Sequence, residues 1–98
     1  MTEPGPAADG AAVRDVKVLN QYGIHARPAA LLVKTASTFR SDVMLEKDGV
    51  EVSAKSIMGL LTMEGHQGAK IRISARGEDA AAAVAALADL FERKFFEE

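Results

Sequence analysis

The sequence predicts an α+β fold: an open-faced sandwich with a four-stranded antiparallel sheet and three helices on one face, in the order βαββαβα. Apolar residues alternate in four short segments and recur with helical spacing in three others. The alternation leaves one face of every strand polar, so one face of the sheet should be exposed to water. The three helices, each with one apolar stripe, are then expected to pack together on the other face.

The composition is that of an ordinary globular protein. The chain has 98 residues, of which 48% are hydrophobic and 27% charged, and its net charge is −2. These values predict one domain, and they imply neither a basic surface for nucleic acid nor a polybasic membrane patch. The absence of cysteine removes disulfides and thiolate nucleophiles. Without a long apolar run or a leader, the chain is expected to be a cytoplasmic protein, most simply a monomer.

The N-terminal part is expected to contain a tail and then a strand. Residues 1–12 hold two of the three prolines and no large apolar side chain after the initiator methionine, which predicts a disordered tail before a domain over residues 13–98. Residues 13–19 carry Val16 and Val18 on one face and a lysine between them, which is typical of a half-buried strand.

A helix is predicted to follow from Ala26. Pro28 falls in its first turn, where the missing N–H has no intrahelical partner to lose. His25 therefore lies near the N-cap. The apolar positions of this segment have the spacing i, i+3, i+4 and i+7, so one stripe should face the core: Ala29, Leu32, Val33 and Ala36.

The middle of the chain predicts a hairpin and a short helix. Residues 41–47 and 50–54 alternate on either side of Asp48-Gly49, a strong two-residue turn signal. Ser56 then precedes a short apolar run, and a serine in that position is a good helix N-cap.

The last third predicts a strand and a long helix. Residues 69–76 alternate, with Ile71, Ile73 and Ala75 on one face. Glu78-Asp79 then opens an alanine-rich helix, where acidic residues suit the helix dipole. Its apolar side is expected to contain Ala80, Ala83, Val84, Leu87, Leu90 and Phe91.

The most informative motif is Gly-Ile-His-Ala-Arg-Pro-Ala-Ala, residues 23–30. A single histidine at a helix start is often only a polar residue or a weak cap. However, the first amides of a helix have no partners within it, so a phosphoryl group on His25 would meet donors from Ala26 onward. Arg27 adds a charged, fork-shaped donor. We therefore interpret His25 as a phosphoacceptor, with Ala26 and Arg27 binding the phosphate.

A second motif, Val-Ser-Ala-Lys-Ser-Ile-Met-Gly-Leu-Leu-Thr-Met at residues 52–63, follows at the right distance. With both motifs, the chain resembles the phosphocarrier protein HPr family of the phosphoenolpyruvate-dependent sugar phosphotransferase system, from about Val13 to about Lys94. The resemblance implies the same fold and a phosphohistidine at His25. It also implies a stoichiometric carrier, without a cofactor, that takes a phosphoryl group from enzyme I and gives it to enzyme IIA.

The second motif has two interpretations that can hold together. Ser56 is by itself a structural N-cap, whereas the resemblance implies regulatory phosphorylation by HPr kinase/phosphorylase and a role with a carbon-control transcription factor. A helix this short cannot bury all of its apolar residues. We expect Ile57, Met58 and Leu61 to form a docking patch near His25 for enzyme I and enzyme IIA, with Met58 the most exposed. The alternative places Ile57 and Leu60 in the core.

Two further residues leave alternatives open. Tyr22 stands where this family often has a small polar residue, so its ring is either an aromatic lid or a source of a hydroxyl near the phosphate. It also resembles the larger residue of the nitrogen-related branch, which leaves a nitrogen-type relay open. His66 is expected to be an incidental loop histidine, and two histidines 41 positions apart predict no metal site.

Three functions compete at this point. The leading hypothesis is the phosphocarrier, which His25 and Arg27 favour. The second is a mainly regulatory protein that acts through Ser56 and carries little phosphoryl flux. The third is an interaction module without phosphotransfer, since folds of this class host unrelated functions.

Overall fold

The computed structural model describes residues 10–97, and it confirms the order βαββαβα and the α+β class. A short 3-10 helix, which the sequence did not predict, follows the last helix. The elements are β1 (Ala11–Lys17), α1 (Ala26–Ala36), β2 (Asp42–Lys47), β3 (Val50–Ser53), α2 (Ile57–Thr62), β4 (Lys70–Arg76), α3 (Ala80–Glu92) and η1 (Lys94–Phe96).

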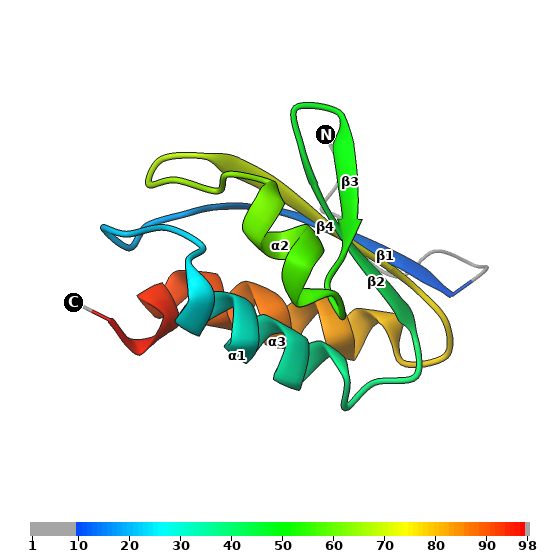
Figure 1. Ribbon diagram of the computed structural model, residues 1–98. Helices are drawn as coiled ribbons and strands as arrows, with labels where there is room; N and C mark the ends of the chain where they lie inside the picture. Colours follow the sequence, from blue (N-terminus) through cyan, green and yellow to red (C-terminus); the bar gives the residue numbers. More distant parts are fainter. Residues whose placement is uncertain (1–9, 98) are drawn as a thin grey trace.

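The four strands form one antiparallel sheet in the order β1-β4-β2-β3. The helices cover one face of this sheet, and α1 and α3 lie side by side along it (Figure 1). In the register, Ile73 of β4 lies opposite both Arg14 of β1 and Leu45 of β2. The open-faced sandwich is therefore confirmed, with one face of the sheet left without helices (Figure 1).

The first strand differs from its prediction at both ends. It begins at Ala11, so Ala11 and Ala12 belong to β1 and not to a tail. The physical reason is pairing: β4 continues to Arg76, which lies opposite Ala11, and Ala12 is buried against the core. The strand ends at Lys17, although the next amide, that of Val18, still donates to the carbonyl of Ala69 just before β4. The rest of the predicted tail, residues 1–9, lies outside the described residues.

The core lies between the sheet and the helices. In α1 the predicted stripe is buried except for Val33, which is half-buried, and Pro28 joins it. The alternation of β4 and the apolar side of α3 are confirmed as core. The largest buried side chains are Phe91, Phe95, Leu32, Leu45, Leu60, Ile71, Ile73 and Leu87.

Two connections show how local chemistry fixes the fold. Asp48 and Gly49 both have positive φ, 53° and 82°, as a two-residue type I′ hairpin requires. Asp79 holds the N-cap position of α3 without capping it, and no acidic residue lies in that helix's first turn, contrary to expectation. Its carboxylate instead accepts from the amides of Arg40 and Ser41 and from the Ser41 hydroxyl, so it ties the loop between α1 and β2 to the start of α3.

Candidate functional site

His25 is the residue immediately before α1, as the sequence predicted. Its backbone is extended, with φ −93° and ψ −165°, and its side chain does not cap the helix. Its carbonyl accepts the Ala29 amide at 2.9 Å. Pro28 has no N–H, and within residues 10–97 no acceptor binds the amides of Ala26 and Arg27. The helix therefore presents two unpaired donors directly beside the imidazole.

The loop that carries His25 is held by a close backbone contact. Gly23 has φ 66°, and a Cβ on it would lie 2.3 Å from the carbonyl oxygen of Gly65. The amide of Ile24 donates to that same carbonyl at 2.8 Å, and the amide of His25 donates to Gly23 at 3.0 Å. Only glycine fits at position 23, and the loop after α2 thereby fixes where α1 begins.

The C-terminal segment reaches the imidazole, a contact that the sequence analysis missed. His25 Nε2 lies 2.9 Å from Glu97 Oε2, and Glu97 Oε1 accepts from Asn20 Nδ2 at 2.9 Å. Asn20 is fully buried, and its Nδ2 also donates to the Gly23 carbonyl at 2.8 Å. Figure 1 shows the red C-terminal segment beside the cyan start of α1. A separation of 72 residues between His25 and Glu97 left no local signal for this pair.

The imidazole is partly open to solvent. The His25 side chain is 42% exposed, whereas the Glu97 side chain is 16% exposed. Among the described residues, none forms a hydrogen bond with His25 Nδ1. Arg27 is exposed, and in the described part of the chain its guanidinium has no ion-pair partner. Nδ1 and the Arg27 side chain are therefore both available to a ligand.

Tyr22 stands beside the site without covering it. Its ring meets the His25 ring edge-on, with 6.2 Å between the ring centroids. The residue is 72% exposed, so the packed aromatic lid is not what forms. Its hydroxyl has no partner among residues 10–97.

Ser56 caps α2 as predicted, because its Oγ accepts the Gly59 amide at 3.1 Å. Of the helix that follows, only Leu60 is buried. The candidate docking residues are exposed, with Met58 the most open at 70%. The alternative that placed Ile57 and Leu60 in the core is confirmed for Leu60 and wrong for Ile57, which is 41% exposed. The loop after α2 contains the Gly65 carbonyl that binds the His25 loop, and α2 packs against α1.

His66, the other histidine, lies in the loop after α2. Its Nδ1 lies 3.0 Å from the carbonyl of Glu64, and its side chain is exposed. Together with Tyr22 and Gly65 it lines a shallow depression of about 190 Å³. The position of His66 in an exposed loop is confirmed, and its lack of a functional role stays a prediction.

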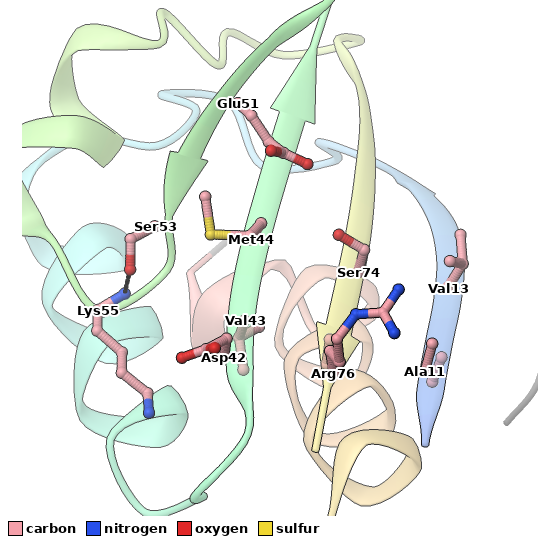
Figure 2. A pocket seen from close by; sticks show the side chains of 12 residues that line it. Ala11, Val13, Asp42, Val43, Met44, Glu51, Ser53, Lys55, Ser74 and Arg76 are labelled. Carbon is pink, nitrogen blue, oxygen red and sulfur yellow. Dashed lines mark hydrogen bonds between the residues drawn. The ribbon is translucent and has the colours of Figure 1, made fainter. Parts of the chain in front are cut away.

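A larger hollow, of about 500 Å³, lies on the helix-free face of the sheet. Figure 2 shows Asp42, Met44 and Ser74 projecting from this face, with Ser53 accepting the amide of Lys55 at the margin. The hollow carries side chains of both charges and does not include His25. The hollow and the histidine therefore lie at different parts of the molecule. We place the candidate site at His25, because the imidazole and the unpaired amides of Ala26 and Arg27 lie together there.

The chain is similar to known proteins over most of its length. The family described as PTS HPr component phosphorylation site matches residues 12–93. The phosphocarrier protein HPr of Treponema pallidum is 48% identical over 86 residues, which cover 88% of this chain and 98% of that protein. A crystal structure of HPr from Thermoanaerobacter tengcongensis superposes with a TM-score of 0.85 at 48% identity, covering 88% of this chain and 97% of the other.

A third relative shows a different assembly. Crh, the Bacillus subtilis catabolite repression protein, is 46% identical with a TM-score of 0.69, covering 81% of this chain and 91% of that chain. Its crystal structure reveals a swapping domain in a dimer.

Within residues 10–97, no helix has the length and hydropathy needed to span a bilayer.

The histidine before α1, the unpaired amides after it and the match over residues 12–93 lead to one assignment. The chain belongs to the HPr family and is a phosphocarrier protein of the phosphotransferase system.

Proposed function

We propose that His25 accepts a phosphoryl group from the phosphohistidine of enzyme I, which phosphoenolpyruvate charges, and passes it to a histidine of enzyme IIA. The observation that carries this proposal is the pair of unpaired amides, Ala26 and Arg27, directly after His25 at the start of α1. These donors and the helix dipole favour a dianionic group beside the imidazole. The exposed Arg27 guanidinium adds a charge-assisted hydrogen bond.

Nδ1 is the nitrogen that we expect to attack, since Nε2 already faces Glu97 at 2.9 Å. The Nδ1 lone pair forms the new N–P bond while the N–P bond of the donor phosphohistidine breaks, and the donor imidazole keeps that electron pair. The same exchange in reverse order passes the group to enzyme IIA. Such a transfer depends on positioning and on stabilising charge at the phosphoryl oxygens, which the amides and Arg27 provide.

The exposed face of α2 supports docking of both partners. Ile57, Met58 and Leu61 are 41%, 70% and 39% exposed, and an apolar patch of this kind is typical of a surface that binds proteins. Because the loop after α2 binds the His25 loop, we expect a partner that covers the patch to reach the imidazole as well. We propose that enzyme I and enzyme IIA bind this patch in turn.

Intact-mass analysis after incubation with phosphoenolpyruvate and enzyme I tests the carrier function. The expected result is a gain of one phosphate that disappears after mild acid, because a phosphohistidine is acid-labile and a phosphoserine is not. His25→Ala should lose this gain completely while its circular dichroism spectrum stays that of the parent.

His66→Ala is the matched control, since His66 is the second of the two histidines and lies on an exposed loop. It should accept phosphate as the parent does. Phosphate gain that persists in His25→Ala would contradict the proposal, and so would an acid-stable gain in the parent.

A second function, regulatory phosphorylation of Ser56 by HPr kinase/phosphorylase, is favoured by the position of Ser56. Its hydroxyl caps α2 immediately before the docking patch. A phosphate there would add nearly two negative charges beside Ile57 and Met58, which disfavours a contact built on apolar surface. The relation to Crh, a protein of catabolite repression, supports the same role, with a carbon-control transcription factor as partner.

Ser56→Asp tests this second function. It should weaken binding to enzyme I, measured as a higher KM for this protein in the transfer assay. Ser53→Asp is the control, because Ser53 lies on the strand before the helix, at the margin of the opposite face of the sheet (Figure 2). An equal KM for Ser56→Asp and the parent would contradict the regulatory role.

A further inference from the structure

The contact between the C-terminal segment and His25 contains a complete hydrogen-bond chain, from the Gly23 carbonyl through Asn20 and Glu97 to the imidazole. The three distances are 2.8, 2.9 and 2.9 Å. Neither the phosphate-binding amides nor the docking patch uses these groups. Their arrangement decides where the proton of a neutral imidazole resides.

The orientation of the Asn20 amide is fixed by its surroundings. Its Nδ2 must face the Gly23 carbonyl and Glu97 Oε1, because the opposite orientation would place Oδ1 against two other acceptors. Asn20 is fully buried, and among the described residues its Oδ1 has no partner, so solvent does not compensate a reversed amide. Asn20 is therefore a fixed donor to one oxygen of Glu97.

The other oxygen of Glu97 can then only accept from His25. An ionised carboxylate accepts hydrogen bonds and cannot donate them, so a neutral imidazole beside it carries its proton on Nε2. Nδ1 is left with an unprotonated lone pair and has no hydrogen-bond partner among the described residues. In a catalytic Ser-His-Asp arrangement the carboxylate has the same relation to its histidine.

We infer that Glu97 is a positioning residue for phosphoryl transfer, which selects the Nε2–H tautomer of His25 and leaves Nδ1 as the nucleophile. This inference rests on the proposed carrier function. When Nδ1 forms its bond to phosphorus and the donor N–P bond breaks, the ring gains positive charge and keeps its proton on Nε2. The Glu97 carboxylate, 2.9 Å away, stabilises that charge as it develops.

The backbone before Glu97 supports a dedicated function for this contact. Lys94, Phe95 and Phe96 have φ of 55°, 55° and 61°, three successive left-handed residues without a glycine. Left-handed backbone is strained for residues other than glycine. The turn is held by the fully buried Phe95, whose ring meets that of Phe91 at a centroid distance of 4.9 Å. This turn lies between α3 and Glu97, the residue that contacts His25.

Nitrogen-15 NMR of the histidine rings tests the inference on the unphosphorylated full chain. The parent should show the Nε2–H tautomer for His25, with Nδ1 at the shift of an unprotonated nitrogen. Glu97→Gln should invert this pattern, because its single acceptor oxygen pairs with the fixed Asn20 donor and its amide group then donates to Nε2. Glu97→Ala should give a mixture of both tautomers. His66→Ala assigns the second set of resonances.

Transfer kinetics from enzyme I provide the second readout. Glu97→Gln should lower the first-order transfer rate constant about tenfold or more with little change in KM, since the attacking nitrogen is protonated. Glu97→Ala should lose less than Glu97→Gln, an order that a purely structural role does not give. Glu92→Gln makes the same charge change on α3, where Glu92 pairs with Arg14, and should behave as the parent.

Either of two results would overturn the inference: an unchanged His25 tautomer in Glu97→Gln, or an equal loss of rate in Glu92→Gln. A failure of the carrier function looks different. In that case the parent accepts no phosphate from enzyme I, while the NMR spectra still report whether Glu97 selects the tautomer.

Discussion

At the scale of single residues, the site depends on backbone positions that only certain side chains can occupy. Gly23 turns the chain so that the Ile24 amide meets the Gly65 carbonyl, and His25 then enters α1 with its imidazole facing Glu97. Small displacements of this loop would move the imidazole relative to the unpaired amides. The transfer rate should therefore be sensitive to substitutions that leave the histidine itself intact.

Gly23→Ala tests this sensitivity. The new Cβ would lie 2.3 Å from the Gly65 carbonyl oxygen in addition to the strain of φ 66°, so unfolding free energy should fall by more than the about 1–3 kcal/mol of backbone strain alone. Gly49→Ala is the matched control, because Gly49 has φ 82° and no atom within 4 Å of an added Cβ. Urea unfolding should show the larger loss for Gly23→Ala, and only this variant should slow phosphate acceptance. Equal losses would contradict the account.

The sequence predicted the residues whose signals are local. His25 and Ser56 each precede an amphipathic segment, and their positions as the residues before α1 and α2 are confirmed. Asn20 and Glu97 carried no such signal. They are 77 residues apart, and their contact depends on the tertiary packing of α3 and on the turn at η1.

At the scale of elements, the loop between α1 and β2 is attached to the start of α3 by one carboxylate. Hydrogen bonds from the Ser41 hydroxyl and from the amides of Arg40 and Ser41 hold the pKa of Asp79 below its ordinary value of 3.8. A carboxyl whose pKa is lowered on folding stabilises the fold above the unfolded-state pKa. That contribution is lost as the pH falls through the lower, folded-state pKa.

Asp79→Asn should consequently lower stability at neutral pH. The difference between parent and variant should shrink as the pH falls below 3.8, since the parent loses the charged form there as well. Chemical denaturation over a pH series measures both values. Glu78→Gln is the control, because its carboxylate makes only a 3.5 Å exposed ion pair with Arg40. A pH-independent difference for Asp79→Asn would contradict this explanation.

Element boundaries were predicted correctly where the sequence has a strong turn signal. They were missed where pairing with a neighbouring strand sets the boundary. The Asp48-Gly49 turn gave the start of β3 at Val50 correctly. The start of β1 was wrong by two residues, because Ala11 and Ala12 have little strand preference and are ordered by their partners on β4. The turn at η1 could not be predicted, since Lys94, Phe95 and Phe96 do not favour left-handed conformations.

At the scale of the whole molecule, a single chain forms the complete four-stranded sheet and the core beneath the helices. Its radius of gyration is 12.2 Å, close to the about 13 Å of a folded domain of 100 residues. Every strand of the described chain pairs within that chain, and α3 packs against β1 and β4. The periodicities that predicted the fold are properties of the entire sequence, which explains why the architecture was predicted more completely than the site.

We therefore expect a monomer in solution, although the Crh relative is a swapped-domain dimer. Light scattering after size-exclusion chromatography should give the chain mass of 10.4 kDa at all protein concentrations. His25→Ala should give the same mass, because the imidazole lies outside the strand pairing. A mass of twice that value would show that the closed protomer is not the only arrangement of this chain.

Tyr22 gives this protein a built-in optical label. It is the sole tyrosine, the chain has no tryptophan, and its ring lies edge-on to the imidazole at 6.2 Å. Ultraviolet emission excited at the tyrosine band therefore originates beside His25 and nowhere else. The arrival of a dianion at that imidazole changes the field around an exposed phenol, so stopped-flow fluorescence can follow loading and unloading in real time without a dye, a radioisotope or a coupled enzyme.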